Sequence, residues 1–439
     1  MFTYYLNLSL RSLKRNKVLT ALMVLAIAVG IGASMTTLTV MHLLSGDPLP
    51  GKSQRIFYPQ VDARPADKTG DEPLDMLDYR SAMDLWQAGR GSRQALIANS
   101  PIKVDVARST RPPLMRTLLS TTTDFFPMFD VPFAYGHPWS AADDADRARV
   151  VVISSRLNER LFGGENSVGK TLRVRGTGLR IVGVLAPWRP SPKFYDVRGG
   201  RFASGQTSWF YGPPEDVLMP FATSLEVNDG HFQQFTCWGM PEVAGHLVDS
   251  SCAWVGLWVQ LDTAAAVADY RSFLSHYAAE QKALGRFSTP RTRLMDLMQW
   301  LDFNRVVPSD VTLQTWLAFA FLLICLFNTV GLLLAKFMRR SGEIGVRRAI
   351  GATRGDVFTQ CLIEAGTVGL LGGVGGFVLT QLGLWLIRRQ PVEYADMAHM
   401  DIGMFLVTFA LAIVSSLVAG AIPALRASRV APALQLKTL

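Results

Sequence analysis

The chain has 439 residues, of which 49% are hydrophobic, and it carries 44 basic and 35 acidic side chains, a formal net charge of +9. Its length allows two or three domains. The segment 45–310 holds 29 basic and 29 acidic residues, so the excess of positive charge lies entirely outside it. This even balance argues against a nucleic-acid-binding protein, which would need a basic stripe on its polar domain.

Four long apolar segments interrupt the polar sequence. They cover residues 18–44, 311–335, 365–387 and 402–425, and each exceeds the roughly 20 residues that a helix needs to cross a bilayer. The first is about twice as long as the apolar core of a signal peptide, so we expect an uncleaved anchor. The sequence therefore predicts four transmembrane helices, the third of which we extend to 357–387.

The charges that flank these spans predict their orientation. Four basic and no acidic residues precede the first span, and six basic residues lie between the second and the third. Lysine and arginine near the ends of spans stay in the cytoplasm. We therefore expect an N-terminal amphipathic segment 1–17, the loop 336–356 and the tail 426–439 to be cytoplasmic, and the large segment 45–310 and the short loop 388–401 to lie outside.

The outer segment has a mixed α+β pattern, which we expect to form two subdomains. Its strands alternate apolar and polar residues, and its helices repeat apolar residues every three to four positions. The predicted elements are strands at 148–154 and 253–261, helices at 155–162 and 263–285, and a hairpin over 171–185.

Two details of this pattern make more specific predictions. On the longer helix, Val267, Tyr270, Leu274 and Tyr277 lie on one stripe, which predicts the buried face. Residues 186–217 are rich in proline, glycine and aromatic residues, which is typical of an exposed excursion, here one that joins the two subdomains.

The stretch LFGGENSVGKTLRV, 161–174, contains the spacing G-x-x-x-x-G-K-T of a phosphate-binding loop. Such a loop needs a strand before it and a helix after it, so that the helix N-terminus faces the phosphates. Here the predicted helix precedes Gly164 and a strand follows Lys170, on the side of the membrane where ATP is scarce. We therefore interpret the stretch as a turn, with a bend at 176–178 inside the hairpin, and predict no nucleotide site.

Cysteines and histidines provide few candidate sites. Cys237 and Cys252 both lie outside, fifteen positions apart, where an oxidising compartment favours a disulfide over two free thiols. Cys325 and Cys361 fall in the spans, where we expect reduced, packed thiols. The six histidines have no metal-ligand spacing, and no Ser, His and Asp set stands out, so we predict neither a metal site nor a catalytic one.

The cytoplasmic loop, KFMRRSGEIGVRRAIGATRGDV, is the most informative stretch. Apolar residues alternate with charged ones as in a short amphipathic helix, and Glu343 and Arg347 have the spacing of an ion pair along it. Two interpretations stay open, a basic collar on anionic lipid headgroups or a docking element.

Two features of the third span predict how it packs. Glu364 needs a partner or access to the membrane interface. Four glycines allow close helix packing, within one chain or between two copies. These glycines are Gly372, Gly373, Gly375 and Gly376.

The motif EIGVRRAIGATRGDV resembles the signature of the MacB/FtsX-type ABC transporter permeases, also called type VII or mechanotransmission systems. The resemblance extends to YLNLSLRSLKRNKVLTALMVLAIAVGIGAS at the first span and to DFFPMFDVPFAYGHPWSAADDA in the outer segment, and it is weakest over 187–250. It implies an α-helical membrane protein with four transmembrane helices, a large α+β MacB-like periplasmic core domain between the first two, and an FtsX-like permease domain over 311–430.

The resemblance also implies partners. The loop 336–356 would couple the permease to a cytoplasmic ABC ATPase dimer on a separate polypeptide, since no nucleotide-binding domain is found. The ATPase dimer would bind ATP and Mg. This chain would hold no cofactor and catalyse no reaction. A second permease copy or a similar permease, membrane lipid, a periplasmic adaptor and an outer-membrane channel complete the expected assembly in a bacterial inner membrane. The coupling residues would be Arg339, Arg340, Glu343, Ile344, Arg347 and Arg348.

Two classes of function remain. In the first, ATP hydrolysis drives movement of the periplasmic domain for export or efflux, with lipoprotein release as a variant of the same class. In the second, the same mechanical coupling signals, either by regulating a cell-wall hydrolase or by sensing an antimicrobial. The large outer segment favours transport.

Overall fold

The computed structural model describes residues 17–68, 70–106, 112–198, 200–202, 206–239, 241, 243 and 245–429. Residues 1–16 of the predicted N-terminal segment and 430–439 of the predicted tail lie outside the described residues. The chain divides into two compact units. We call them the helical unit, Met1–Ser45 with Val307–Leu439, and the α/β unit, Gly46–Val306.

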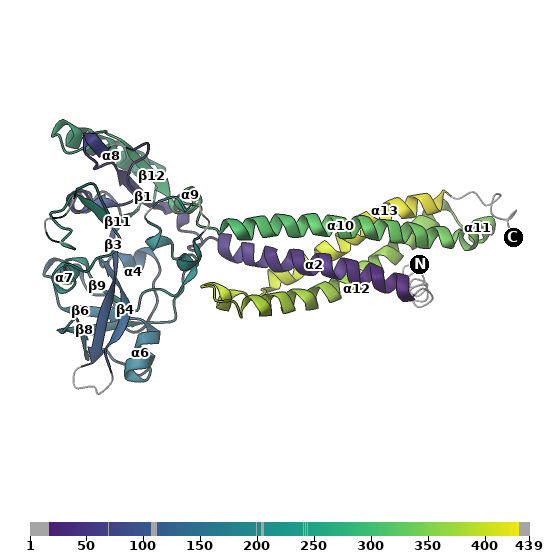
Figure 1. Cartoon of the computed structure of the whole chain (residues 1–439), viewed down its shortest axis with the longest axis horizontal. Helices are drawn as coiled ribbons and strands as arrows, with labels where there is room; N and C mark the ends of the chain where they lie inside the picture. Colours follow the sequence, from purple (N-terminus) through teal and green to yellow (C-terminus); the bar gives the residue numbers. More distant parts are fainter. Residues whose placement is uncertain are drawn as a thin grey trace. The chain divides into compact units, whose positions relative to one another are not determined.

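Among the described residues, four helices are long and apolar enough to cross a membrane (Figure 1). The longest has 34 residues. At ~1.5 Å per residue it is ~51 Å long and exceeds the ~30 Å hydrocarbon core of a bilayer, so its first turns have room outside that core. The four predicted apolar helices are thereby confirmed, as α2 (Lys17–Ser45), α10 (Ser309–Arg339), α12 (Arg354–Ile387) and α13 (Ile402–Ser428).

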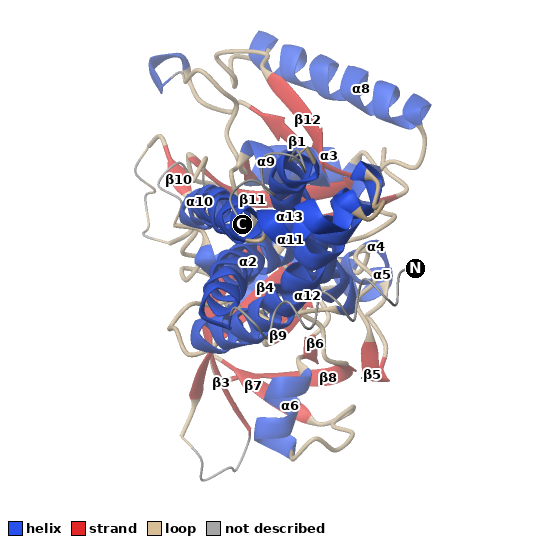
Figure 2. Cartoon of the chain, turned by 90° about the vertical axis from the view of Figure 1, so that its right-hand side faces the viewer, coloured by secondary structure: helices blue, strands red, loops and turns tan. Residues whose placement is uncertain are grey.

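The four helices pack side by side (Figures 1 and 2). α10 and α12 each pack against both α2 and α13, and α2 also touches α13. Apolar side chains fill the interior, among them Ile27, Leu333 and Val368. Trp316 and Phe327 of α10 are exposed on the outside of the helical unit. Apolar residues all round a helix are typical of a membrane span, in which lipid covers the outer face.

The four glycines of α12 pack within the chain. A methyl group added at any of them would lie too close to a side chain of α2 or α13. The structure therefore favours the first of the two packing interpretations, and these glycines give no argument for a second copy. The distances from the added carbon are 2.5 Å at Gly372 to Ile27, 2.9 Å at Gly373 to Ala412, 2.9 Å at Gly375 to Ala28 and 2.8 Å at Gly376 to Ile31.

A continuous path of hydrogen-bonded strands runs through the α/β unit in the order β12-β1-β11-β3-β4-β9-β6-β8-β5. β2 and β10 pair with β11, and β7 pairs with β3 and β8. The strands are β1 (Ile56–Val61), β2 (Leu77–Asp78), β3 (Arg93–Val106), β4 (Leu114–Thr121), β5 (Phe133–Gly136), β6 (Val150–Ile153), β7 (Thr171–Val174), β8 (Thr177–Leu185), β9 (Val217–Pro220), β10 (Thr236–Cys237), β11 (Cys252–Gln260) and β12 (Thr292–Asp296).

Helices lie between these strands and, in the case of α9, after the last of them. The described ones are α3 (Tyr79–Gln87), α4 (Phe125–Met128), α5 (Ala141–Ala145), α6 (Ser155–Phe162), α7 (Phe221–Val227), α8 (Ala264–Ala283) and α9 (Leu297–Phe303). Single 3₁₀ turns occur at η1 (Ser53–Arg55), η2 (Ala66–Lys68), η3 (Phe194–Asp196) and η4 (Ser208–Tyr211), and η5 (Ala395–Met397) belongs to the helical unit.

β3 contributes to two buried clusters in the described part of the α/β unit. Leu96, near the start of β3, packs in the cluster that contains Trp254 and Leu274. Val104, near its end, packs in the cluster that contains Val151. β3 is 14 residues long, and this length allows one strand to reach both clusters.

The predicted elements of the outer segment are all found, as β6, α6, the β7–β8 hairpin, β11 and α8. Tyr270, Leu274 and Tyr277 are buried, as the stripe predicted, and Val267 is half-buried. The bend of the hairpin lies at Arg175 and Gly176, with φ of 48° and 87°, and not at 176–178. Two consecutive positive φ values suit a two-residue turn, because its twist matches that of the strands.

The local order differs from that of a phosphate-binding loop. α6 precedes Gly164 and ends at Gly163 in the left-handed conformation, and β7 begins at Thr171. No helix follows Lys170, so no helix N-terminus faces the loop.

The expectation that 186–217 forms an exposed excursion is wrong. Phe194, Tyr195 and Tyr211 are fully buried, and the ring of Tyr195 meets that of Phe125 edge to face, with 5.3 Å between centroids. Proline and glycine in this segment produce an irregular backbone, whereas its aromatic side chains have enough apolar surface to fill the core. These aromatic side chains of the segment therefore belong to the packed interior of the α/β unit.

Candidate functional site

The short helix α11 (Ser341–Ala349) joins α10 to α12 at one end of the helical unit (Figure 1). Thr353 caps α12: its Oγ1 accepts a hydrogen bond from the N–H of Asp356 at 3.1 Å, and the Asp356 carboxylate accepts one from the N–H of Thr353 at 2.9 Å. Such a capping box fixes where a helix begins. The predicted loop 336–356 is thus mostly helical, and its end is the first turn of α12.

Glu364 of α12 holds two basic side chains from the end of α10. Its Oε1 lies 2.6 Å from Nζ of Lys336, and its Oε2 accepts a hydrogen bond from Nη1 of Arg340 at 3.2 Å. The side chains of Lys336 and Glu364 are 0% and 2% exposed. A buried charge is stable only when it is paired and hydrogen-bonded. The expectation that Glu364 needs a partner is met by these two cations.

Arg340 extends this network to α11. Its Nε and Nη2 each donate to one oxygen of the Glu343 carboxylate, both at 3.2 Å. Glu343 also accepts from Nη2 of Arg347 at 2.9 Å, which is the predicted pair four positions apart, and Nη1 of Arg347 donates to Oε1 of Gln360 at 3.0 Å. Gln360 lies on α12, so α11 is bound by ionic and polar contacts to both neighbouring helices.

The remaining side chains of α11 divide between an inner and an outer face. Ile344 packs against the apolar core of the helical unit. Val346 is 41% exposed and Ile350, which follows the helix, is 82% exposed. Arg339, in the last turn of α10, is exposed as well. Two of these three exposed side chains are apolar and one is basic, and we call the three together the outer face of the α11 junction.

The six residues predicted to couple the chain to a partner therefore do not form one exposed surface. Arg340 and Arg347 both bind Glu343, and each also binds a residue of α12. Ile344 packs inward, and Arg339 is exposed. Arg348 is half-buried on α11.

Four participants escaped the sequence-based prediction. In the sequence, Lys336 has the position of a flanking charge at the end of a span, and Gln360 is an ordinary polar residue. Val346 and Ile350 are apolar, which predicts burial, but both are exposed. The spacing held one usable signal: Gln360 and Glu364 are four positions apart and therefore share one face of α12.

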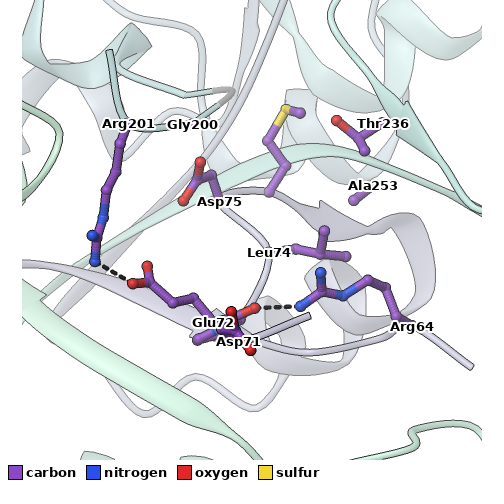
Figure 3. Close-up of a pocket in the computed structure, with 11 residues that line it drawn as sticks. Arg64, Asp71, Glu72, Leu74, Asp75, Gly200, Arg201, Thr236 and Ala253 are labelled. Atoms are coloured by element: carbon purple, nitrogen blue, oxygen red, sulfur yellow. Dashed lines mark hydrogen bonds and ion pairs between the residues drawn. The ribbon is translucent and has the colours of Figure 1, made fainter. Parts of the chain in front are cut away.

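A pocket of about 440 Å³ opens in the α/β unit, lined by acidic and basic side chains (Figure 3). Glu72 binds Arg201 and, at 3.3 Å, Arg293, and both guanidinium groups also lie over the ring of Phe303, 4.1 and 4.3 Å from its centroid. Burial raises the pKa of the Asp75 carboxyl, and the positive charge of Arg293 opposes this shift. Glu72 and Arg201 of this pocket thus bind each other.

A second polar cluster lies inside the α/β unit. The buried guanidinium of Arg198 donates to Asp196 at 2.8 Å, to Asn99 at 3.0 Å and to the carbonyl of Ile97 at 3.0 Å. Burial raises the pKa of Asp196, and the charge of Arg198 counteracts it. These bonds tie the segment 186–217 to β3, which explains why it is held in the interior.

Cys237 and Cys252 are joined by a disulfide. They lie opposite each other on the antiparallel strands β10 and β11. Cys325 and Cys361 are buried and free. Within the described ranges, no group of three or more His, Cys, Asp or Glu side chains could hold a metal ion.

Two family models match the chain. The MacB-like periplasmic core domain matches residues 20–272, and the FtsX-like permease C-terminal domain matches residues 316–432.

Curated relatives match most of the chain at low identity. The pyoverdine export ATP-binding/permease protein PvdT of Pseudomonas entomophila is 26% identical over 70% of this chain and 41% of its own length. The macrolide export ATP-binding/permease proteins MacB of Pasteurella multocida and Escherichia coli K12 are 24% and 23% identical over 96% and 98% of this chain. The chain spans 58% and 60% of their lengths.

Among solved structures, the periplasmic region of MacB from Actinobacillus actinomycetemcomitans aligns with 57% of this chain and 92% of its own, at a TM-score of 0.35 and 13% identity. The extracellular domain of the noncanonic ABC-type transporter YknZ from Gram-positive bacteria aligns with 55% of this chain and 100% of its own, at a TM-score of 0.35 and 12% identity.

Proposed function

The chain belongs to the MacB/FtsX family of ABC transporter permeases, and from this premise we propose that it is the membrane subunit of an ATP-driven exporter, powered by a separate cytoplasmic ATPase that docks on the outer face of the α11 junction. The chain itself then hydrolyses no ATP, and ATP and Mg are bound by the partner. Movement of the docked helix drives a conformational change in the α/β unit on the other side of the membrane.

The observation that carries the proposal is the division of α11 into two faces. One face is fixed to α10 and α12 by Arg340 and Arg347, whereas the other exposes Val346 and Ile350. Exposed apolar side chains beside basic ones are typical of a protein-binding surface. A collar for lipid headgroups would direct most of its arginines outward. Arg339 is exposed, whereas Arg340 and Arg347 are engaged inside the chain.

The charge distribution supports the orientation. Basic side chains gather at the α11 junction, and the positive-inside rule assigns such an end to the cytoplasm. We therefore propose an inner-membrane protein with both termini inside and the α/β unit in the periplasm.

The helices themselves support movement of substrate outside the membrane. The segments 311–335, 365–387 and 402–425 contain no charged residue, and 18–44 contains only His42 as an ionisable group. A hydrophilic conduit through the bilayer needs polar or charged residues along its length. We propose instead that the α/β unit moves the substrate, with a periplasmic adaptor, an outer-membrane channel and a second permease subunit, either a second copy or a similar permease.

The names of the relatives, which specify macrolide or pyoverdine export, support the export class.

Affinity purification of the full chain from its host membrane, followed by mass spectrometry, tests this proposal. We expect an ATPase subunit together with a periplasmic adaptor. Recovery of a cell-wall hydrolase in place of the adaptor would identify the signalling class of function, and a preparation without any ATPase would refute the proposal.

A further inference from the structure

We propose that Glu364, Arg340, Glu343, Arg347 and Gln360 form a closed ring, here called the clamp, through which any displacement of α11 is transferred to α12, with Glu364 as its positioning residue. The inference rests on the proposed function, because it states how the docking helix acts on the membrane helices.

The clamp joins α11 and α12 at two points. From Glu364 the contacts run to Arg340, then to Glu343 and Arg347 of α11, and return to α12 at Gln360. Glu343 and Arg347 are four positions apart on one helix, and Gln360 and Glu364 are four positions apart on the other. Each pair therefore lies on one helix face about one turn apart. Two attachments about one turn apart prevent α11 from rotating on α12 and also prevent the two helices from moving apart.

Arg340 links the two carboxylates of the clamp through one guanidinium group. Three donor atoms of its planar guanidinium are used, two on Glu343 and one on Glu364, each at 3.2 Å. A lysine keeps the positive charge but has no planar fork, so it cannot hold both carboxylates in this geometry. The variant Arg340→Lys therefore opens the ring without leaving a carboxylate unpaired.

Beyond the clamp, α12 has little freedom to move alone. Gly372 and Gly376 lie against Ile27 and Ile31 of α2, where not even a methyl group would fit. A shift of α12 must therefore displace α2, because close-packed interiors have few voids that could absorb it. The last residue of α2, Ser45, leads directly into the α/β unit along the chain.

Lys336 complicates the simplest test. It is fully buried against Glu364, so Glu364→Gln alone would leave a buried cation without its counter-ion and could prevent folding. The double variant Lys336→Met with Glu364→Gln removes both charges at similar volume. Arg388→Gln is the matched control, because Arg388 lies at the other end of α12 and donates to the carbonyl of Ala398 at 2.7 Å.

The experiment has two readouts on the full chain in lipid nanodiscs. The first is hydrogen exchange of the α11 amides, 341–349, with the chain alone. The second is the ATP-dependent change in the mobility of a spin label at Ser45→Cys, an exposed position, with the partner ATPase bound. We expect Arg340→Lys and the double variant to speed α11 exchange about tenfold and to abolish the label response while the ATPase stays bound. The control should behave like the parent chain.

Unchanged exchange in both clamp variants, or a preserved label response, would overturn the clamp. If the parent chain binds no ATPase or shows no response to ATP, the proposed function fails, and the exchange readout still decides whether the clamp holds α11.

Discussion

The ammonium group of Lys170 lies over the ring of Phe162, 5.0 Å from its centroid. This cation–π contact joins the end of α6 to the start of the β7–β8 hairpin, and it uses the lysine that a phosphate-binding loop would direct at a nucleotide. We expect Lys170→Ala to leave nucleotide binding and ATP turnover of the assembled complex unchanged. Equilibrium titration with a fluorescent ATP analogue checks this, and weaker binding in the variant would identify the loop as a nucleotide site.

The disulfide between Cys237 and Cys252 closes a loop across a sequence separation of 15. A loop of this length restricts the unfolded chain and contributes about 3 kcal/mol to stability. We expect the double variant Cys237→Ser, Cys252→Ser to lower the thermal unfolding temperature of the chain and to abolish its sensitivity to reductant. Thiol counting under non-reducing conditions should find only Cys325 and Cys361, and four reactive thiols would contradict the bridge.

The outer face of the α11 junction should govern ATPase binding. Burial of an Ile or Val side chain contributes about 1.5–3 kcal/mol, so replacement of Ile350 or Val346 by Asp should weaken ATPase binding roughly tenfold or more. Surface plasmon resonance with the chain in nanodiscs measures the affinity. Leu284→Asp is the control, because Leu284 is an equally apolar, exposed residue of the α/β unit. Equal affinity of the Ile350→Asp variant and the control would exclude this surface.

Asp144 should titrate near neutral pH. Burial raises the pKa of its carboxyl from 3.8 to about 6, although it accepts hydrogen bonds from Nε1 of Trp139 at 2.7 Å and from the N–H of Thr123 at 2.7 Å, which oppose the shift. Because the folded pKa is raised, the proton stabilises the fold fully below pH 3.8, and this contribution is lost as the pH rises through about 6.

The fluorescence of Trp139 should report this titration. The fluorescence of Trp139 is the difference in fluorescence between the parent chain and Trp139→Phe. We expect this difference to change with pH with a midpoint near pH 6, and we expect Asp144→Asn to abolish the change. Thermal unfolding should show the stability of the parent chain falling relative to Asp144→Asn between pH 4 and 7. A midpoint near pH 4 would mean that the two hydrogen bonds cancel the effect of burial on the pKa.

Much of the fold follows from the sequence because the relevant signals are local. An apolar run of sufficient length specifies a membrane helix wherever it occurs, and the stripe of Tyr270, Leu274 and Tyr277 marks the buried face of α8 through helix periodicity alone. The β7–β8 hairpin is similarly local, and its bend was misplaced by one residue because Arg175 adopts a positive φ that sequence patterns assign to glycine.

The candidate site was harder to predict because its contacts join distant positions. Glu343 and Arg347 share a helix, and their pairing could be anticipated. Arg340 meets Glu364 across 24 positions, and this contact depends on where α10 ends and how α12 is rotated. The segment 186–217 was misjudged for a related reason: composition indicates an irregular backbone, but burial depends on the space that the strands leave for Tyr195 and Phe194.

Because α12 is one uninterrupted helix, the number of residues between two of its side chains fixes the directions in which they point. Glu364 and Gln360 must face α10 and α11 at its beginning, while Gly372 and Gly376 must face α2 further along the same helix. One inserted residue between these sets would turn one against the other by about 100° and lengthen the helix by about 1.5 Å. The eight-residue spacing from Glu364 to Gly372 is therefore as constrained as the residues themselves. The turn between α11 and α12 can differ in length, provided that the contacts of the clamp still form.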